Sequence, residues 1–248
     1  KDIMRRELIV EMIRDTSANI VMIQEPGSLD QDTMAHIRRL LRLTFGEIKV
    51  IYQRFNCRYG GILTIVTKDW VHRVKKVIWD PKSLARYHAI QLRGKQAKTI
   101  TVINTYRPHF KSTGLRSVAE YQRMRLELND AYSSIEESYE QDIRNSIFEE
   151  LREGHEVILT GDINKRTYDE IQLWETMELA SMVNCLEVTL QIKNQPTRVP
   201  GEGAAIDHIY NSSGIQTLSG GILEKTTLSD HTPIWAQFSG LNVFYNVA

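Results

Sequence analysis

Four acidic residues stand at or beside the ends of apolar runs that are typical of buried strands. They are Glu25 after IVMIQ, Asp162 after VILTG, Asp207 within AIDHIY and Asp230 in LSDHTPIW. A carboxylate at such a place is costly to bury unless a partner offsets its charge. Four of them in one chain indicate an oxygen-rich cluster, and clusters of this kind bind hard cations such as Mg²⁺.

Two further side chains would complete such a cluster. His231 directly follows Asp230, which places a group that titrates near neutrality beside a carboxylate that could bind metal. Asn164 follows Asp162 in the run GDIN and adds an amide. Each residue taken alone has an ordinary explanation, such as a strand-end cap, an Asx turn or a solvated surface histidine. The prediction therefore depends on the combination and its placement on strands.

Apolar periodicity predicts a chain of mixed α and β structure. The predicted strands are 19–24, 48–53, 61–68, 74–79, 87–93, 99–106, 156–161, 205–210, 215–223, 233–238 and the C-terminal octet 241–248. Helical patterns cover 2–14, 30–43, 117–153 (as one or two helices) and a segment near 168–180. The density of β-branched residues and the regular spacing favour a sheet sandwich over βαβ units.

The composition is that of an ordinary globular protein, and we expect one domain over residues 1–248. Lys plus Arg and Asp plus Glu are 31 each, so the net charge is zero and binding of a polyanion would need a local basic patch. The two cysteines, Cys57 and Cys185, do not make a disulfide framework and favour a reducing, intracellular compartment. No apolar run approaches the ~18 residues of a membrane span.

Five motifs, in this order along the chain, resemble those of the endonuclease/exonuclease/phosphatase superfamily. They are IQEP (23–26), VINTYRP (102–108), ILTGDINKR (158–166), PTRVPGEGAAIDHIY (196–210) and LSDHTPIW (228–235). The resemblance implies an α+β fold like that of DNase I, a four-layer α/β/β/α sandwich in which helices flank two packed mixed β-sheets. The combination of YRP, PTR…IDHIY and SDH is most similar to the apurinic-type endonuclease domain of non-LTR retrotransposons.

The resemblance assigns roles in metal binding and water activation. Glu25 would be the principal Mg²⁺ ligand, and Asp230 would help to hold the metal. Asp162 would orient or deprotonate the attacking water, and Asn164 would form a hydrogen bond with the scissile phosphate. A divalent ion with polarised donors can stabilise the charge that grows during phosphodiester hydrolysis. The sequence does not distinguish one ion from two.

The remaining catalytic roles concern the phosphate. His231 would contact it and either carry protons or stabilise its charge, and Asp207 would orient His231 as carboxylates orient imidazoles elsewhere. Tyr106 would touch the phosphate or the leaving group. The ordinary explanations are that Asp207 pairs with a nearby arginine and that Tyr106 packs at a strand end.

Basic residues beside these motifs predict a rim that contacts a DNA backbone. They are Arg107, His109 and Lys111 after the VINTY run, Lys165 and Arg166 after GDIN, and Arg198 in PTR. Each one could also be an ordinary solvated charge, and the arginine of PTR could instead brace a loop.

The C-terminal octet LNVFYNVA is the one motif out of order. The first strand of the family ends in an Asn of the type xWNVxG and precedes the first helix, whereas this sequence begins on a helical pattern. Tyr245–Asn246–Val247 resembles that tripeptide, and Ser239–Gly240 would make a two-residue hairpin turn before it. We therefore predict a circular permutation in which Asn246 completes the site. The alternative is an unrelated linker strand, with the true first strand cut off at Lys1.

Together these features predict a Mg²⁺-dependent DNA endonuclease, with Mn²⁺ as a substitute metal. In a retroelement the nick would supply a 3′-hydroxyl for target-primed reverse transcription, within a polyprotein that includes a reverse transcriptase and acts in the nucleus. The alternatives are another phosphoesterase of the superfamily (an RNA nuclease, a deadenylase or a phosphoinositide phosphatase) and a catalytically inert nucleic-acid-binding module.

Overall fold

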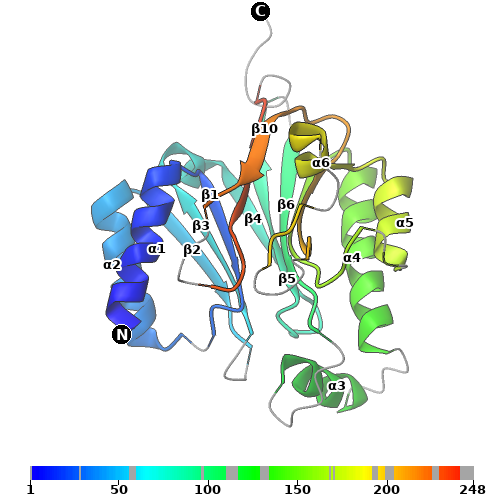
Figure 1. Cartoon of the computed structure of the whole chain (residues 1–248), viewed down its shortest axis with the longest axis horizontal. Helices are drawn as coiled ribbons and strands as arrows, with labels where there is room; N and C mark the ends of the chain where they lie inside the picture. The colour runs from blue at the N-terminus through cyan, green and yellow to red at the C-terminus, as the bar shows by residue number, and fades with distance from the viewer. Residues whose placement is uncertain are drawn as a thin grey trace, which may run out of the picture.

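The computed structural model describes residues 2–27, 29–55, 60–95, 98–109, 117–128, 134–167, 169, 171–191, 195–198, 204–224 and 229–240. The predicted C-terminal strand with Asn246 lies outside these residues, as does Lys111. Two groups of strands pack face to face in the middle of the molecule, and helices cover their outer sides (Figure 1).

The larger sheet has six strands in the order β4–β5–β6–β7–β9–β8. They are β4 (Val74–Trp79), β5 (Tyr87–Arg93), β6 (Thr99–Tyr106), β7 (Glu156–Asp162), β8 (Val183–Asn184) and β9 (Asp207–Asn211). Neighbouring strands are antiparallel except β6 and β7, which run parallel. The chain crosses between these two through α3 (Val118–Leu128) and α4 (Ile135–Arg152), because parallel strands need a long connection. The expectation of a sandwich without βαβ units is therefore wrong at this crossover.

A second set of strands packs against the larger sheet. Strands β1 (Ile20–Gln24), β3 (Ile62–Thr67) and β2 (Ile48–Gln53) form an antiparallel sheet in that order. Strands β10 (Thr217–Ile222) and β11 (Ile234–Phe238) form an antiparallel pair. β3 is buried along its whole length, as its run of apolar and β-branched residues, ILTIVT, predicts. β1 packs on β6 and β7, so the end of β1 lies near the larger sheet.

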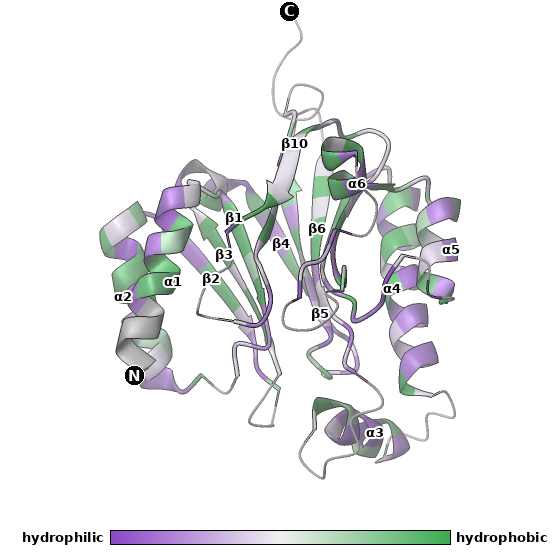
Figure 2. Ribbon diagram, viewed as in Figure 1, coloured by the Kyte–Doolittle hydropathy of each residue, from purple (hydrophilic) through white to green (hydrophobic). Residues whose placement is uncertain are grey.

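Three apolar clusters fill the spaces between four layers. One joins the two groups of strands and includes Val66, Ile90 and Ile209. A second packs α4 and α5 (Gln172–Leu179) on the larger sheet, and a third packs α1 (Asp2–Thr16) and α2 (Gln31–Phe45) on β3. Figure 2 shows hydrophobic residues along the strands and mixed stripes along the helices. The predicted α/β/β/α sandwich is confirmed.

The helix ends follow the usual capping chemistry. Asp30 caps α2 by accepting a hydrogen bond from the Thr33 amide at 2.7 Å, and Ser134 and Glu137 form a capping box at the start of α4. The short elements η1 (Lys68–Arg73), α6 (Cys185–Leu190) and β8 were not predicted. None of the described helices combines the length and the apolar character that a membrane crossing requires.

A chain of buried polar side chains links the two sheets across the core. Gln24 donates to Asn104 at 2.7 Å, and Asn104 donates to the hydroxyl of Thr64 at 3.0 Å and to the Leu63 carbonyl at 3.1 Å. The Thr64 hydroxyl also forms a hydrogen bond with Nε2 of His88, 2.6 Å away, in which either atom can be the donor. Nδ1 of His88 is buried and has no hydrogen-bond partner among the described residues.

We expect the protein to lose stability through His88 as the pH falls from 6.5 to 4. Burial lowers the pKa of His88 to about 4, so between these values the unfolded chain binds a proton that the folded chain does not. The contribution of His88 to the free energy of unfolding is therefore fully present above pH 6.5. It is lost as the pH falls from 6.5 to 4. At about 1.4 kcal/mol per pKa unit, the loss is about 3 kcal/mol.

Urea denaturation at pH 7 and pH 4 measures this loss in the wild type and in His88→Gln. Glutamine lacks the titrating group, so the variant should lose about 3 kcal/mol less than the wild type over the same interval. Equal losses in the two proteins would show that His88 does not cause the pH dependence.

Candidate active site

Three of the predicted site residues share one row across the larger sheet. Tyr106 at the end of β6 pairs with Asp162 at the end of β7, and Asp162 pairs with Asp207 at the start of β9. Side chains in one row of a sheet point to the same face. The strand register alone therefore brings a tyrosine and two carboxylates together, with Tyr106 and Asp162 both buried.

Gly161 permits this register. A Cβ atom at Gly161 would stand 1.8 Å from the carbonyl oxygen of Thr105 on β6. No side chain can be accommodated at that distance, so only glycine allows β7 to lie against β6 here. The glycine of GDIN is thus required for the strand pairing that positions Asp162.

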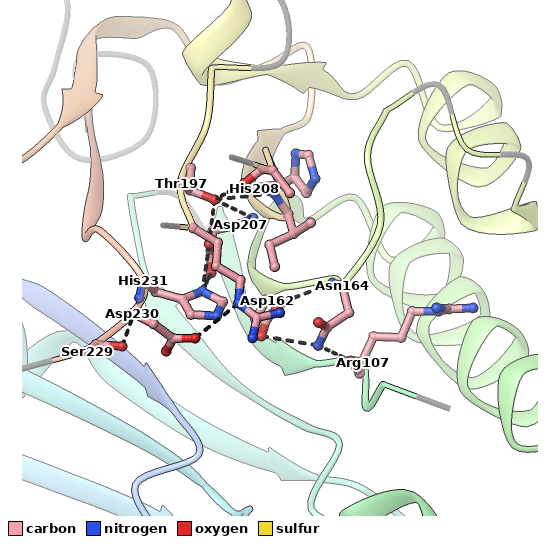
Figure 3. Close-up of polar contacts among 12 residues, drawn as sticks. Arg107, Asp162, Asn164, Thr197, Asp207, His208, Ser229, Asp230 and His231 are labelled. Atoms are coloured by element: carbon pink, nitrogen blue, oxygen red, sulfur yellow. Dashed lines mark hydrogen bonds and ion pairs between the residues drawn. The ribbon is translucent and has the colours of Figure 1, made fainter. Parts of the chain in front are cut away.

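Asp162 is a buried carboxylate with a second carboxylate beside it. Burial raises its pKa well above 3.8 and the charge of Asp207 raises it further, whereas the charge of His231 and a hydrogen bond from the Asn164 amide lower it. Asn164 donates through its backbone to Oδ1 at 2.9 Å and through its side chain to Oδ2 at 3.2 Å (Figure 3). Its side chain also donates to the carbonyl of Arg107 at 2.8 Å. Asn164 therefore orients Asp162, and its predicted bond to the scissile phosphate would require one of these bonds to be exchanged.

A carboxylate–histidine pair lies beside Asp162. Nδ1 of His231 is 2.9 and 3.1 Å from the two oxygens of Asp207 (Figure 3). Burial opposes protonation of His231, but the hydrogen bond and charge of Asp207, with the charges of Asp162 and Asp230, outweigh it and raise the pKa of His231 to about 9. The imidazole is therefore cationic at neutral pH, and Asp207 holds it in the way that the sequence predicted.

Thr197 is a site residue that sequence reasoning missed. Its hydroxyl donates to Asp207 at 2.6 Å and accepts from the backbone amides of Ile206 and Asp207, each at 3.2 Å. Its carbonyl accepts from the amide of Thr232, the residue after His231, at 2.6 Å. Thr197 thus fixes both members of the carboxylate–histidine pair. It is the middle residue of the PTR motif, in which only the arginine was predicted to have a role at the site.

Glu25 reaches the site from the smaller sheet. It follows β1 with a left-handed backbone, φ 50°, and its amide donates to the Gly61 carbonyl at 3.1 Å. Burial of the carboxyl group raises its pKa, whereas a hydrogen bond with Tyr106 and the charge of His231 lower it. The residue as a whole is solvent-exposed, so water screens these effects. These interactions place Glu25 in the same cluster as Tyr106 and His231.

Asp230 lies at the exposed side of the cluster. Its Oδ2 accepts from Nε of Arg198 at 3.0 Å, and the two side chains are 50% and 46% exposed. Ion pairs this exposed contribute at most about 1 kcal/mol, so Arg198 can exchange Asp230 for another anion at little cost. Arg198 therefore lies beside Asp230 and here binds a carboxylate of the chain itself, and its contact with nucleic acid stays a prediction.

The charges of the cluster fit a divalent cation. The described residues place four carboxyl groups within electrostatic reach of two cationic side chains, which leaves an excess of two negative charges when all are ionised. The carboxyl groups belong to Glu25, Asp162, Asp207 and Asp230, and the cations are His231 and Arg198. Ligand atoms of Asp162, Asp207 and His231 lie within 4.8 Å of one another. The two predicted ligands, Glu25 and Asp230, lie outside this compact group and border it.

Arg107 does not belong to an exposed basic rim. Its side chain is 4% exposed, and Nη2 lies 3.0 Å from a carboxylate oxygen of Glu140 on α4. Its backbone instead supports the site, because its amide donates to the Asp162 carbonyl at 2.8 Å and its carbonyl accepts from Asn164. A buried, paired guanidinium cannot reach a DNA phosphate without losing its partner. The predicted nucleic-acid contact is therefore corrected to a positioning role.

Lys165 and Arg166 lie directly after the site residues of β7 and are half-buried. The carbonyl of Lys165 accepts from Nε2 of His208, and that of Arg166 accepts from Nε1 of Trp174, each at 2.9 Å. These contacts fix the backbone and give His208 a structural role. Lys165, Arg166 and Arg198 remain the predicted basic rim, with His109 exposed nearby in sequence.

The sandwich is similar in fold to solved structures of endonuclease/exonuclease/phosphatase proteins, which is the fold that the motifs predicted. The 3′-5′ exonuclease NExo of Neisseria meningitidis matches with 16% identity over 94% of this chain and 94% of its own, at a TM-score of 0.67. The APE2 catalytic domain of Xenopus laevis matches with 16% identity over 97% and 89%, at a TM-score of 0.66. An endonuclease/exonuclease/phosphatase of Bacteroides vulgatus matches with 17% identity over 95% and 90%, at a TM-score of 0.63.

Comparison of sequences identifies no relative of the chain. No protein-family model matches the chain, and no curated protein sequence matches it. The structural similarity therefore establishes the fold. The chemistry of the site depends on its own residues, because one fold can carry many functions.

Proposed function

We propose that the protein is a metal-dependent phosphodiesterase that cleaves DNA as an endonuclease. One observation carries the proposal: four carboxyl groups with an excess of negative charge surround a cationic histidine, His231. A divalent cation would balance that charge, and a cationic imidazole beside it suits the negative charge that grows on a phosphoryl group during hydrolysis. The shared fold with a 3′-5′ exonuclease and the APE2 catalytic domain supports the proposal.

The side chains would divide the chemistry among them. Glu25 and Asp230, with Asp162 beside them, would hold Mg²⁺, which when bound polarises the phosphate oxygens. The raised pKa of Asp162 suits a group that orients or deprotonates the attacking water. His231 would keep Nδ1 on Asp207 and present a protonated Nε2 to the phosphate.

Tyr106 would act on the other side of the phosphate. Its hydrogen bond with Glu25 would orient its hydroxyl towards the phosphate or the leaving oxygen. Asn164 would act mainly by holding Asp162, with exchange of one hydrogen bond allowing it to contact the phosphate. Each of these two side chains would therefore contact both the substrate phosphate and a carboxylate of the site.

The proposed substrate is DNA in the setting of a non-LTR retroelement. Lys165, Arg166 and Arg198 border the site and could contact a phosphate backbone. The YRP and PTR…IDHIY motifs favour this setting over RNA or phosphoinositide substrates. The nick would provide a 3′-hydroxyl for a reverse transcriptase in the same polyprotein.

A supercoiled plasmid tests the proposal. With Mg²⁺ we expect nicked circles, and EDTA should abolish them. Glu25→Ala should lower the nicking rate by about a hundredfold or more, whereas Glu149→Ala, which removes an exposed acid from α4, should leave it unchanged. A plasmid that stays supercoiled while the intact chain binds it would identify an inert binding module. Release of mononucleotides from linear ends without nicking would identify an exonuclease.

We also propose that residues 241–248 add a strand between β11 and β1, which is the predicted permutation. Among the described strands, β11 pairs only with β10 and β1 only with β3, and both pack on the same cluster of the larger sheet. A two-residue turn at Ser239–Gly240 would place Asn246 opposite Pro233, two residues from His231. An experimental structure with the Asn246 amide more than ~8 Å from His231 would contradict this, since hydrogen-bonding groups of one site lie within a few ångströms.

A further inference from the structure

The solvent side of α2 carries a row of arginines. Ala35, Arg38, Arg39, Arg42 and Leu43 recur at helical spacing on one face, and all five are exposed. They line a surface depression with a volume of about 470 Å³. Figure 1 shows α2 on the outer side of the smaller sheet, so that β1, β3 and β2 separate it from the larger sheet and its row of site residues. We call this surface the α2 arginine face.

The arginines of this face have no anionic partner among the described residues. Elsewhere on the surface, Arg14, Arg123, Arg198 and Lys82 each pair with a carboxylate, whereas the exposed Lys75, Lys76 and Arg152 form no ion pair among the described residues. The α2 arginines also repel one another, because Arg42 follows Arg38 by four residues and Arg39 by three. Like charges at these spacings destabilise a helix.

Few stabilising interactions within the helix offset this repulsion. Only Arg42 lies in the last turn of α2, where the helix dipole favours a cation. Arg38 and Arg39 lie in the middle of the helix, and no acidic residue stands three or four positions from either of them. A local arrangement that disfavours the helix without a structural gain is typical of a functional surface.

We propose that the α2 arginine face binds the phosphodiester backbone of nucleic acid outside the active site. Guanidinium groups bind phosphate oxygens through two parallel hydrogen bonds, and successive turns of a helix offer them about 5.4 Å apart. The chain has zero net charge, so long-range attraction of a polyanion must come from a local patch of this kind. A protein partner fits less well, because the face has only Leu43 and Ala35 as apolar contacts, whereas protein interfaces have an apolar core.

This surface would act independently of hydrolysis. It uses no residue of the Asp162–His231 cluster and would bind a duplex equally well in a chain with no activity. Its role would be to hold a flanking segment of nucleic acid while another segment occupies the site, which raises the effective concentration of the substrate.

Binding in EDTA at several salt concentrations tests the proposal. The probes are a fluorescein-labelled 40-base-pair DNA duplex and a single-stranded RNA of the same length, so that the two arms identify the form of nucleic acid. The variant Arg38→Gln/Arg39→Gln/Arg42→Gln should bind at least one probe about tenfold or more weakly at 100 mM salt. For the DNA duplex, the slope of the logarithm of the association constant against the logarithm of the salt concentration should decrease in magnitude by about 2 to 3. Each lost phosphate contact reduces the magnitude of this slope by about 0.9.

A matched control removes the same charge elsewhere. Lys75→Gln/Lys76→Gln/Arg152→Gln alters three exposed cations on β4 and α4, and it should keep the affinity and slope of the wild type. Circular dichroism and thermal melting establish that both triple variants are folded, and the α2 variant should melt no lower than the wild type. The α2 variant should also hydrolyse bis(p-nitrophenyl) phosphate at the wild-type rate, because that substrate is too small to reach α2.

Three outcomes would overturn the proposal. Equal loss of affinity in both triple variants would show a general effect of charge. Unchanged affinity in the α2 variant would show that nucleic acid does not use this face. Unchanged affinity together with loss of a dimer in light scattering would assign the face to a second copy of the chain. A failure to hydrolyse any phosphodiester would instead bear on the proposed function alone.

Discussion

Replacement of Asp162 with asparagine is expected to lower phosphodiester hydrolysis by about three orders of magnitude while making the metal-free protein more stable. The loss of activity follows because an amide cannot accept a proton from water or balance a divalent cation. Asparagine keeps the size of aspartate and one of its two acceptor oxygens, so one of the two hydrogen bonds from Asn164 is retained and the row across β6, β7 and β9 should persist.

The gain in stability follows from the surroundings of Asp162. Burial and the charge of Asp207 disfavour the ionised carboxylate more than His231 and Asn164 favour it, which is why its pKa is raised. Removing that charge should raise the free energy of unfolding by on the order of 1 kcal/mol, the usual gain when a strained functional site is relieved. Function and stability therefore change in opposite directions at this residue.

Urea denaturation in EDTA and in excess Mg²⁺ measures both effects. The wild type should gain about 2.7 kcal/mol when Mg²⁺ is present at a hundred times its dissociation constant, whereas Asp162→Asn should gain much less. Asp15→Asn, at an exposed residue of α1, is the matched control and should change neither property. A variant that is less stable than the wild type in EDTA, or that keeps more than a tenth of its activity, would contradict this account of Asp162.

Replacement of His231 with alanine should lower the rate of hydrolysis by about two to four orders of magnitude, the usual contribution of a positioned acid or charged donor. The imidazole is the one cationic side chain held directly by Asp207, and its pKa of about 9 keeps it charged at neutral pH. Initial rates under single-turnover conditions measure the effect, since product release then does not mask the chemical step.

His231→Ala also leaves Asp207 without its cation, so a second substitution separates chemistry from folding. His231→Gln can still donate a hydrogen bond to Asp207 but carries no charge, so it should retain more stability than alanine and still lose most of the activity. His72→Ala removes an exposed histidine paired with Glu47 and should have no effect on rate. A loss of less than tenfold in both His231 variants would exclude a catalytic role for this residue.

The layers of the fold could be predicted because the strongest signals were local. β3, β6 and β7 are rich in β-branched and apolar residues, and α2 and α4 carry periodic apolar faces with capping residues. The parallel pairing of β6 with β7 could not be read from these runs, because strand direction depends on contacts between distant segments. β8 and α6 were missed because two and six residues are too short for a period to be visible.

At the site, the residue types could be predicted but their detailed partners could not. The sequence identified the carboxylates and His231 because each one stands at a strand end, and the register of β6, β7 and β9 then brought three of the residues together. It misjudged Arg107 because an arginine after a strand gives no sign of whether Glu140, 33 positions later, will bury and pair it. Thr197 was missed because a hydroxyl that holds a carboxylate resembles any loop threonine in sequence.

The site is divided between two sheets that have no strand in common. Glu25 comes from the end of β1, whereas Asp162, Asp207 and Tyr106 belong to the larger sheet, and the Gln24–Asn104 hydrogen bond crosses the same core. A ligand held by both groups can bind only while the sheets are docked, so binding and docking are thermodynamically linked. Such a ligand would act as a clamp, and amide hydrogen exchange in β1 and β7 should slow together when it binds. A core mutation far from any carboxylate that loosens the docking would then weaken ligand affinity.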